Sequence, residues 1–172
     1  MAPVPIHVPW VDGLEPFKVA VTPRPEGGAR LPRVLAAMRA QGVEVVVSML
    51  EPKEQEWLDL ATQHAACVQA GIDYVSCPVQ DRGVPRGVEH ILPVARRLAR
   101  ELSAGRGVLF HCFAGIGRSP LMAACTLAVL GVAPLRALEA ISRARGLPVP
   151  DTDEQRAFVL EFARGLTIYG GQ

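Results

Sequence analysis

The 172-residue sequence has no run of apolar residues long enough to span a bilayer, and residues 1–10 lack the basic start and apolar core of a signal peptide. Its formal net charge is only +1 at pH 7, so overall charge gives no reason to expect a nucleic-acid or membrane partner. We therefore expect a soluble, cytoplasmic monomer that binds neither nucleic acids nor membranes.

Patterns typical of disulfide, metal and nucleotide sites are also missing. The four cysteines are not closely paired, and the chain is long for a disulfide scaffold, so we expect reduced thiols. His64 and Cys67 have a ligand-like spacing, but no second pair accompanies them, and we predict neither a metal nor a cofactor. The nucleotide-binding loop requires lysine after its glycine, whereas this sequence has Arg118 after Gly117.

What the sequence does contain is an alternation of apolar strand-like and helix-like segments in a composition of 49% hydrophobic residues. We expect one domain over residues 1–172, with a proline-rich, irregular segment at 1–16. The patterns predict strands at 17–21, 43–50, 72–79 and 107–110, and helices at 31–38, 53–70, 88–102, 121–130, 134–145 and after 155. This order predicts an α/β fold with a central, mostly parallel sheet flanked by helices.

A loop at the carboxyl end of the fourth predicted strand combines the features of an anion site with a cysteine. Its sequence is His111-Cys112-Phe113-Ala114-Gly115-Ile116-Gly117-Arg118-Ser119. The first N–H groups of the following helix have no partner within the helix, and its dipole favours an anion. Gly115 and Gly117 allow the backbone amides of residues 113–117 to turn toward one point. The loop is thus predicted to bind phosphate.

The side chains of this loop suggest covalent catalysis. An environment that binds phosphate also favours the thiolate form of Cys112, which would be the nucleophile. The guanidinium of Arg118 matches two phosphate oxygens and keeps its charge. His111 would hold the cysteine backbone or sulfur by hydrogen bonding, and the Ser119 hydroxyl would donate to the sulfur as it leaves. The alternative for Cys112 and Arg118 is a buried structural cysteine beside a surface arginine.

The spacing of His-Cys, five residues and Arg-Ser resembles the signature of the cysteine-dependent protein phosphatases. The resemblance is closest to the small dual-specificity members, in particular the kinase-associated-phosphatase subgroup, and includes residues 123–125 and 143–146. It implies a phosphotyrosine-phosphatase-like fold and metal-free hydrolysis of phosphotyrosine, and of phosphoserine or phosphothreonine, on a protein or peptide substrate. The reaction would pass through a phosphocysteine.

Asp81 lies 31 positions before Cys112 (112 − 81), near where the resembled family places its general acid, in a similar Pro-x-x-Asp setting. A positioned carboxylic acid would protonate the leaving oxygen. The alternative is a turn or capping aspartate. Arg82 and Arg86 either contact an anionic substrate or form a solvated face. Gln155 either completes a capping box with Thr152 or, as the resemblance implies, helps to orient water.

Other functions remain open. A phosphoinositide or other small phosphate ester is one alternative substrate, although the loop lacks the lysines of phosphoinositide-directed relatives. A phosphoprotein-binding module without turnover is a second alternative. A sulfur-transfer or arsenate-reducing enzyme is a third. Oxidation of Cys112 is expected, and Cys67 or Cys77 would be its partner in a protective disulfide.

Overall fold

A computed structural model describes residues 5–169, with side chains described through residue 167. Its helices and strands are, in chain order, β1 (Val19–Thr22), η1 (Gly28–Arg30), α1 (Leu31–Ala40), β2 (Val43–Ser48), α2 (Pro52–Trp57), α3 (Gln63–Ala70), β3 (Asp73–Ser76), α4 (Val88–Ser103), β4 (Gly107–His111), α5 (Arg118–Val129), α6 (Pro134–Arg145) and α7 (Asp153–Tyr169). Residues 5–16 are irregular apart from one antiparallel bridge between Trp10 and Ala20, and residues 1–4 of the predicted irregular segment lie outside the described residues.

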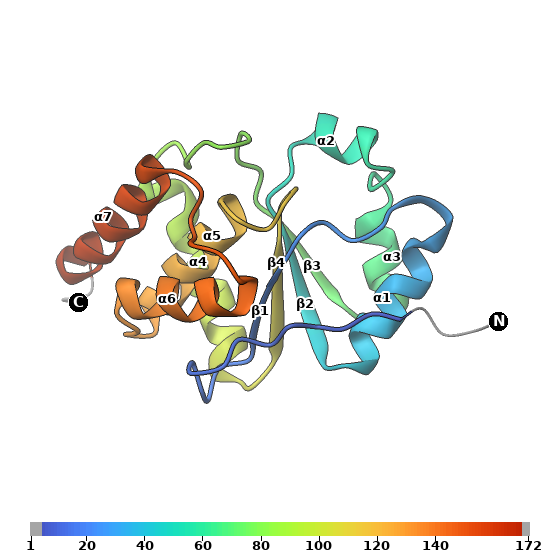
Figure 1. Ribbon diagram of the computed structural model, residues 1–172, viewed down its shortest axis with the longest axis horizontal. Helices are drawn as coiled ribbons and strands as arrows, with labels where there is room; N and C mark the ends of the chain where they lie inside the picture. Colours follow the sequence, from blue (N-terminus) through green and yellow to red (C-terminus); the bar gives the residue numbers. More distant parts are fainter. Residues whose placement is uncertain (1–4, 170–172) are drawn as a thin grey trace.

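The strands form a parallel sheet in the order β1-β4-β2-β3, so β4 lies inside the sheet between β1 and β2. The prediction of an α/β fold with a mostly parallel sheet is confirmed. Because all described strands run the same way, their carboxyl ends meet at one edge, where loops from different parts of the chain come together (Figure 1).

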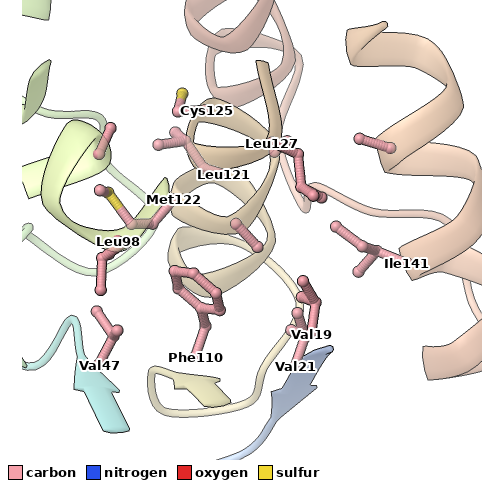
Figure 2. Packing of buried hydrophobic residues seen from close by; sticks show 14 of the residues in the cluster. Val19, Val21, Val47, Leu98, Phe110, Leu121, Met122, Cys125, Leu127 and Ile141 are labelled. Carbon is pink, nitrogen blue, oxygen red and sulfur yellow. The ribbon is translucent and has the colours of Figure 1, made fainter. Parts of the chain in front are cut away.

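Helices cover both faces of this sheet, and the strand side chains alternate between two apolar layers. Ala20, Val46 and Leu109 face a layer built with α1 and α3, whereas Val21, Val47 and Phe110 face the layer of α4, α5 and α6. Helix α5 is apolar all round because it lies between β4 and the outer helices α4, α6 and α7. Figure 2 shows this packing, with side chains of α5 over strand residues and beside those of neighbouring helices. The labelled residues are Val19, Val21, Val47, Leu98, Phe110, Leu121, Met122, Cys125, Leu127 and Ile141.

One predicted element is wrong. The single helix expected over 53–70 is two helices, α2 and α3, separated by residues 58–62. Asp59 takes a positive φ of 53°, which no helix continues, and Leu60 is buried, whereas Trp57 and Val68 are 79% and 63% exposed. The helical spacing of the apolar residues between 57 and 68 therefore does not correspond to one buried face of a single helix. Among residues 5–169, no helix has the length and apolarity needed to cross a membrane.

Candidate active site

The loop from Cys112 to Gly117 joins the buried strand β4 to the N-terminus of α5 at the carboxyl edge of the sheet (Figure 1). At Gly115 the backbone has a φ of +72°, and a Cβ there would lie 2.5 Å from the carbonyl carbon and oxygen of Thr22. Only glycine fits such a position without displacing the end of β1. The close approach fixes the loop against the strand that lies beside β4.

Cys112 is 3% exposed, and its Sγ has two hydrogen-bonding neighbours. The backbone N–H of Gly115 donates to Sγ over 3.3 Å, and the Ser119 Oγ lies 3.2 Å from it. Both the loop amide and the hydroxyl therefore point at the sulfur, which is the placement that the sequence predicted for Ser119. Together they form hydrogen-bond donors able to stabilise negative charge on the sulfur.

His111 is fully buried and contacts the backbone of Cys112 rather than its sulfur. Its Nδ1 lies 3.3 Å from the Cys112 carbonyl oxygen, and its Nε2 lies 2.9 Å from the amide nitrogen of Gln63. Because Gln63 Nε2 only donates, Nε2 of His111 accepts and Nδ1 carries the hydrogen donated to Cys112. Burial, with a smaller contribution from the nearby Arg118 charge, lowers the pKa of His111 to about 4 despite the opposing hydrogen bond to Cys112. The imidazole is therefore neutral at pH 7.

Arg118 is a buried cation whose guanidinium is held by a carboxylate that the sequence analysis missed. Its Nη1 and Nη2 each donate over 2.8 Å to one oxygen of Glu54, a bidentate pair. Nη1 also donates to the carbonyl oxygens of Val79 (2.9 Å) and Met49 (3.4 Å). Burial opposes the charge of both partners, but their hydrogen bonds and mutual attraction outweigh it. The pKa of Glu54 is thus lowered and that of Arg118 raised.

Asp81 accepts a hydrogen bond from the same guanidinium. Its Oδ1 accepts a hydrogen bond of 3.2 Å from Arg118 Nη2, while 68% of its side chain is exposed. The two residues and Cys112 line one pocket of about 180 Å³. The structure thus brings the predicted acid, 31 positions upstream of Cys112 (112 − 81), to the loop that holds the predicted nucleophile and the anion-binding arginine.

The remaining walls of the pocket come from residues 113, 114, 116 and 117 of the loop and from Arg82, Asp151 and Gln155. Arg82 forms an exposed ion pair of 3.6 Å with Asp151, and Arg86 is not among the lining residues. Gln155 forms the predicted capping box with Thr152, through two hydrogen bonds of 3.1 Å. Its Nε2 also donates to the carbonyl oxygen of Gly83, beside the acid. The capping alternative is confirmed, and a role toward water stays a prediction.

All four cysteines are free thiols. Cys67 and Cys77 lie on different faces of the sheet. Cys67 lies in the apolar layer of α1 and α3, on the other face of the sheet, where burial raises its pKa to about 12. Cys77 packs against the layer that contains Cys112. His64, the predicted neighbour of Cys67 in a weak ligand pattern, stacks on Tyr74 with ring centroids 5.3 Å apart. In the part of the chain that the structure describes, no group of three or more acidic, histidine or cysteine side chains is placed to hold a metal ion.

Comparison with known proteins gives the family. A sequence model described as "Polymorphic toxin system, DSP-PTPase phosphatase" matches residues 24–132, which include Asp81, Cys112 and Arg118. The chain therefore belongs to the dual-specificity phosphatases of the cysteine-based protein tyrosine phosphatase family.

Individual relatives agree with this assignment. Cyclin-dependent kinase inhibitor 3 of Rattus norvegicus is 33% identical over 103 residues, and that of Homo sapiens is 32% identical over 103 residues. The aligned part is 59% of this chain and 48% of each relative, so the chain spans about half the length of the curated relatives it matches.

Solved structures share the fold over nearly the whole chain. Kinase-associated phosphatase, in a form with its catalytic-site cysteine replaced by serine, superposes with a TM-score of 0.83 at 22% identity, covering 96% of this chain and 98% of that one. PTPMT1 in complex with PI(5)P superposes with a TM-score of 0.73 at 22% identity, covering 94% and 99%. At these identities the likeness shows the fold alone.

Proposed function

We propose that the chain is a metal-independent phosphatase that hydrolyses phosphotyrosine, and phosphoserine or phosphothreonine, on proteins through a phosphocysteine intermediate. The observation that carries the proposal is the convergence of Cys112, Arg118 and Asp81 on one pocket. We further propose that it acts as one phosphatase domain over residues 1–172, as a cytoplasmic monomer.

In the first step, Cys112 Sγ attacks phosphorus in line with the leaving oxygen, so that an S–P bond forms as the P–O bond breaks. The backbone amides of the loop and the Arg118 guanidinium hold the phosphate oxygens. Because Arg118 Nη2 also donates to Asp81, a bound phosphate oxygen competes with that carboxyl for the same N–H. Phosphate binding would thereby release Asp81 to protonate the leaving oxygen.

In the second step, Asp81 takes a proton from water, whose oxygen attacks phosphorus and breaks the S–P bond. Ser119 Oγ, 3.2 Å from the sulfur, donates a hydrogen bond to the departing thiolate. His111 keeps the Cys112 carbonyl fixed throughout, and as a neutral ring it adds no charge to the pocket. Free phosphate and the starting thiolate result, so the chemistry balances without an external reactant other than water.

The first test is release of phenolate from an aryl phosphate in the presence of a chelator, with Cys112→Ser, Asp81→Asn and the exposed-site control Asp12→Asn. We expect turnover by the parent and the control, none by Cys112→Ser, and a loss of about 100-fold with a changed pH profile for Asp81→Asn. An inactive parent, or a serine variant that keeps its rate, would overturn the proposal. Tight phosphopeptide binding without phosphate release would support the binding-module alternative, and faster turnover of inositol phosphates than of phosphopeptides would support the phosphoinositide alternative.

A further inference from the structure

Helix α2 carries the largest exposed apolar side chain of the described residues close to the candidate active site. Trp57 is 79% exposed, although it follows by three positions the buried Glu54 that holds Arg118. Positions i and i+3 are neighbours on a helix surface, so Trp57 lies beside the residue whose carboxylate holds Arg118. A tryptophan side chain is seldom left this exposed, because burying it would stabilise the fold. Tryptophan is also enriched among the residues that contribute most to binding a partner.

The backbone that presents Trp57 is fixed at both ends of the helix. At its start, Glu54 Oε2 accepts a hydrogen bond of 2.8 Å from the Glu51 N–H. After its end, the Asp59 carbonyl accepts one of 2.8 Å from Gly28, and the buried Leu60 donates over 2.8 Å to Gln55. A segment whose backbone is already fixed loses less backbone freedom when a partner binds than a mobile segment does.

Trp57 lines a groove of about 490 Å³ that adjoins the phosphate pocket, because the two share lining residues. We name it the Trp57–Phe113 groove; its walls also include Lys53, Gln80 and Asp81. Phe113 and Asp81 line the phosphate pocket as well, so the two cavities share a rim. Phe113 is 43% exposed, and the Arg24 guanidinium covers its ring with 4.4 Å to the centroid, which leaves the ring held between the two cavities.

The shared rim decides what can lie in the groove. A phosphorylated side chain with its phosphate at Cys112 has its main chain at the pocket mouth, and residues of that polypeptide that leave past Asp81 and Phe113 enter the groove. The groove offers those residues the aromatic side chains of Trp57 and Phe113 and the ammonium group of Lys53. A small aryl or inositol phosphate has no such extension, and would leave the groove empty.

Building on the proposed function, we propose that the Trp57–Phe113 groove binds the polypeptide segment next to the phosphorylated residue of a phosphoprotein, with a large apolar side chain against Trp57. The phosphate pocket supplies the chemistry, and the groove selects among phosphorylated sites. Trp57 is thus a specificity-determining residue that touches neither the phosphate nor the reacting atoms.

Kinetics on matched peptides test this inference. Phosphotyrosine peptides with leucine or serine at one position adjacent to the phosphotyrosine, on either side, are compared in the full chain, in Trp57→Ala and in Val68→Ala, which removes an exposed apolar residue of α3 outside the groove. We expect the parent to prefer the leucine peptide on one side. Trp57→Ala should lower kcat/KM for that peptide about tenfold more than for an aryl phosphate, mainly through KM, and erase the preference. Val68→Ala should behave as the parent.

Equal kcat/KM of the parent for the leucine and serine peptides would overturn the proposed role of the groove. Equal losses of kcat/KM for peptide and aryl phosphate in Trp57→Ala would overturn it too. Both results would leave the phosphatase proposal intact. A parent that self-associates in light scattering and becomes monomeric in Trp57→Ala would also overturn the proposed role of the groove, because a second copy would then occupy the groove. If no substrate turns over, calorimetric binding of the same peptides decides. Preference for the leucine peptide that Trp57→Ala loses supports the groove, and its absence contradicts it.

Discussion

At the scale of single residues, the pair of Arg118 and Glu54 dominates the site's electrostatics. Arg118 is only 2% exposed, so water can replace little of what a lost partner of its guanidinium would have supplied. A buried cation of this kind is tolerated only when its N–H groups are satisfied and its charge is compensated. Glu54 supplies the charge and both short hydrogen bonds, while Asp81 contributes one bond from a mostly exposed side chain.

We therefore predict that Glu54→Gln destabilises the fold by about 3 kcal/mol and lowers kcat/KM, since it leaves a buried charge without its compensating carboxylate. Urea unfolding and aryl phosphate kinetics measure the two effects. The matched control is Glu56→Gln, an exposed glutamate of the same helix, which should keep both values. Equal behaviour of the two variants would show that Glu54 is dispensable.

The neutral, buried His111 makes a prediction about pH. Its pKa is about 4 in the folded chain and about 6.5 when unfolded, so between these values the unfolded state takes up a proton that the folded state refuses. The neutral ring of His111 contributes about 3 kcal/mol to the free energy of unfolding. This contribution is present above pH about 6.5 and is lost as the pH falls to about 4. Urea unfolding across this range should show a smaller loss in His111→Gln than in the parent. His90→Gln, at a side chain 55% exposed, should follow the parent. An unchanged pH dependence in His111→Gln would contradict the assignment.

At the scale of elements, the loop depends on the strand beside it. Gly115 and Gly131 both have positive φ, +72° and +84°, but a Cβ at Gly131 would meet nothing within 4 Å, whereas one at Gly115 would strike the Thr22 backbone. Alanine at either position costs about 1 kcal/mol of backbone strain. Only Gly115→Ala should also displace the amide that donates to Cys112, lowering kcat/KM by about 100-fold. Aryl phosphate kinetics and urea unfolding of both variants test this, and equal activity of the two would refute it.

The elements of the site differ in how far the sequence predicts them. Cys112, Arg118 and Ser119 were predictable because one short loop holds them at fixed spacing, and Asp81 followed from the family resemblance. Glu54 was not, since its partner lies 64 positions away and a glutamate near a helix start has an ordinary explanation as a cap. The break between α2 and α3 was missed for a related reason. Between the two helices, Leu60 is buried in the core and the Asp59 carbonyl accepts a hydrogen bond from the N–H of the distant Gly28, and local periodicity contains neither feature.

At the scale of the whole molecule, the parallel sheet accounts for both the predictable architecture and the placement of the site. Alternating strands and helices were sufficient to predict the fold class, because a parallel sheet needs helices on both faces and gathers its loops at one edge. Which loops meet there depends on the strand order β1-β4-β2-β3, which no local pattern contains. That order sets the Cys112 loop between the turn after β1 and the segments after β2 and β3 that carry Glu54 and Asp81.

The most direct test of the central claim is detection of phosphate on Cys112 during turnover. Parent and Cys112→Ser are mixed with an aryl phosphate, quenched within one turnover, and analysed by intact mass and peptide mapping. We predict that the parent gains one phosphoryl group on the peptide containing Cys112 and that Cys112→Ser neither gains it nor turns over. Turnover with phosphate on another residue, or turnover that persists in Cys112→Ser, would contradict the account.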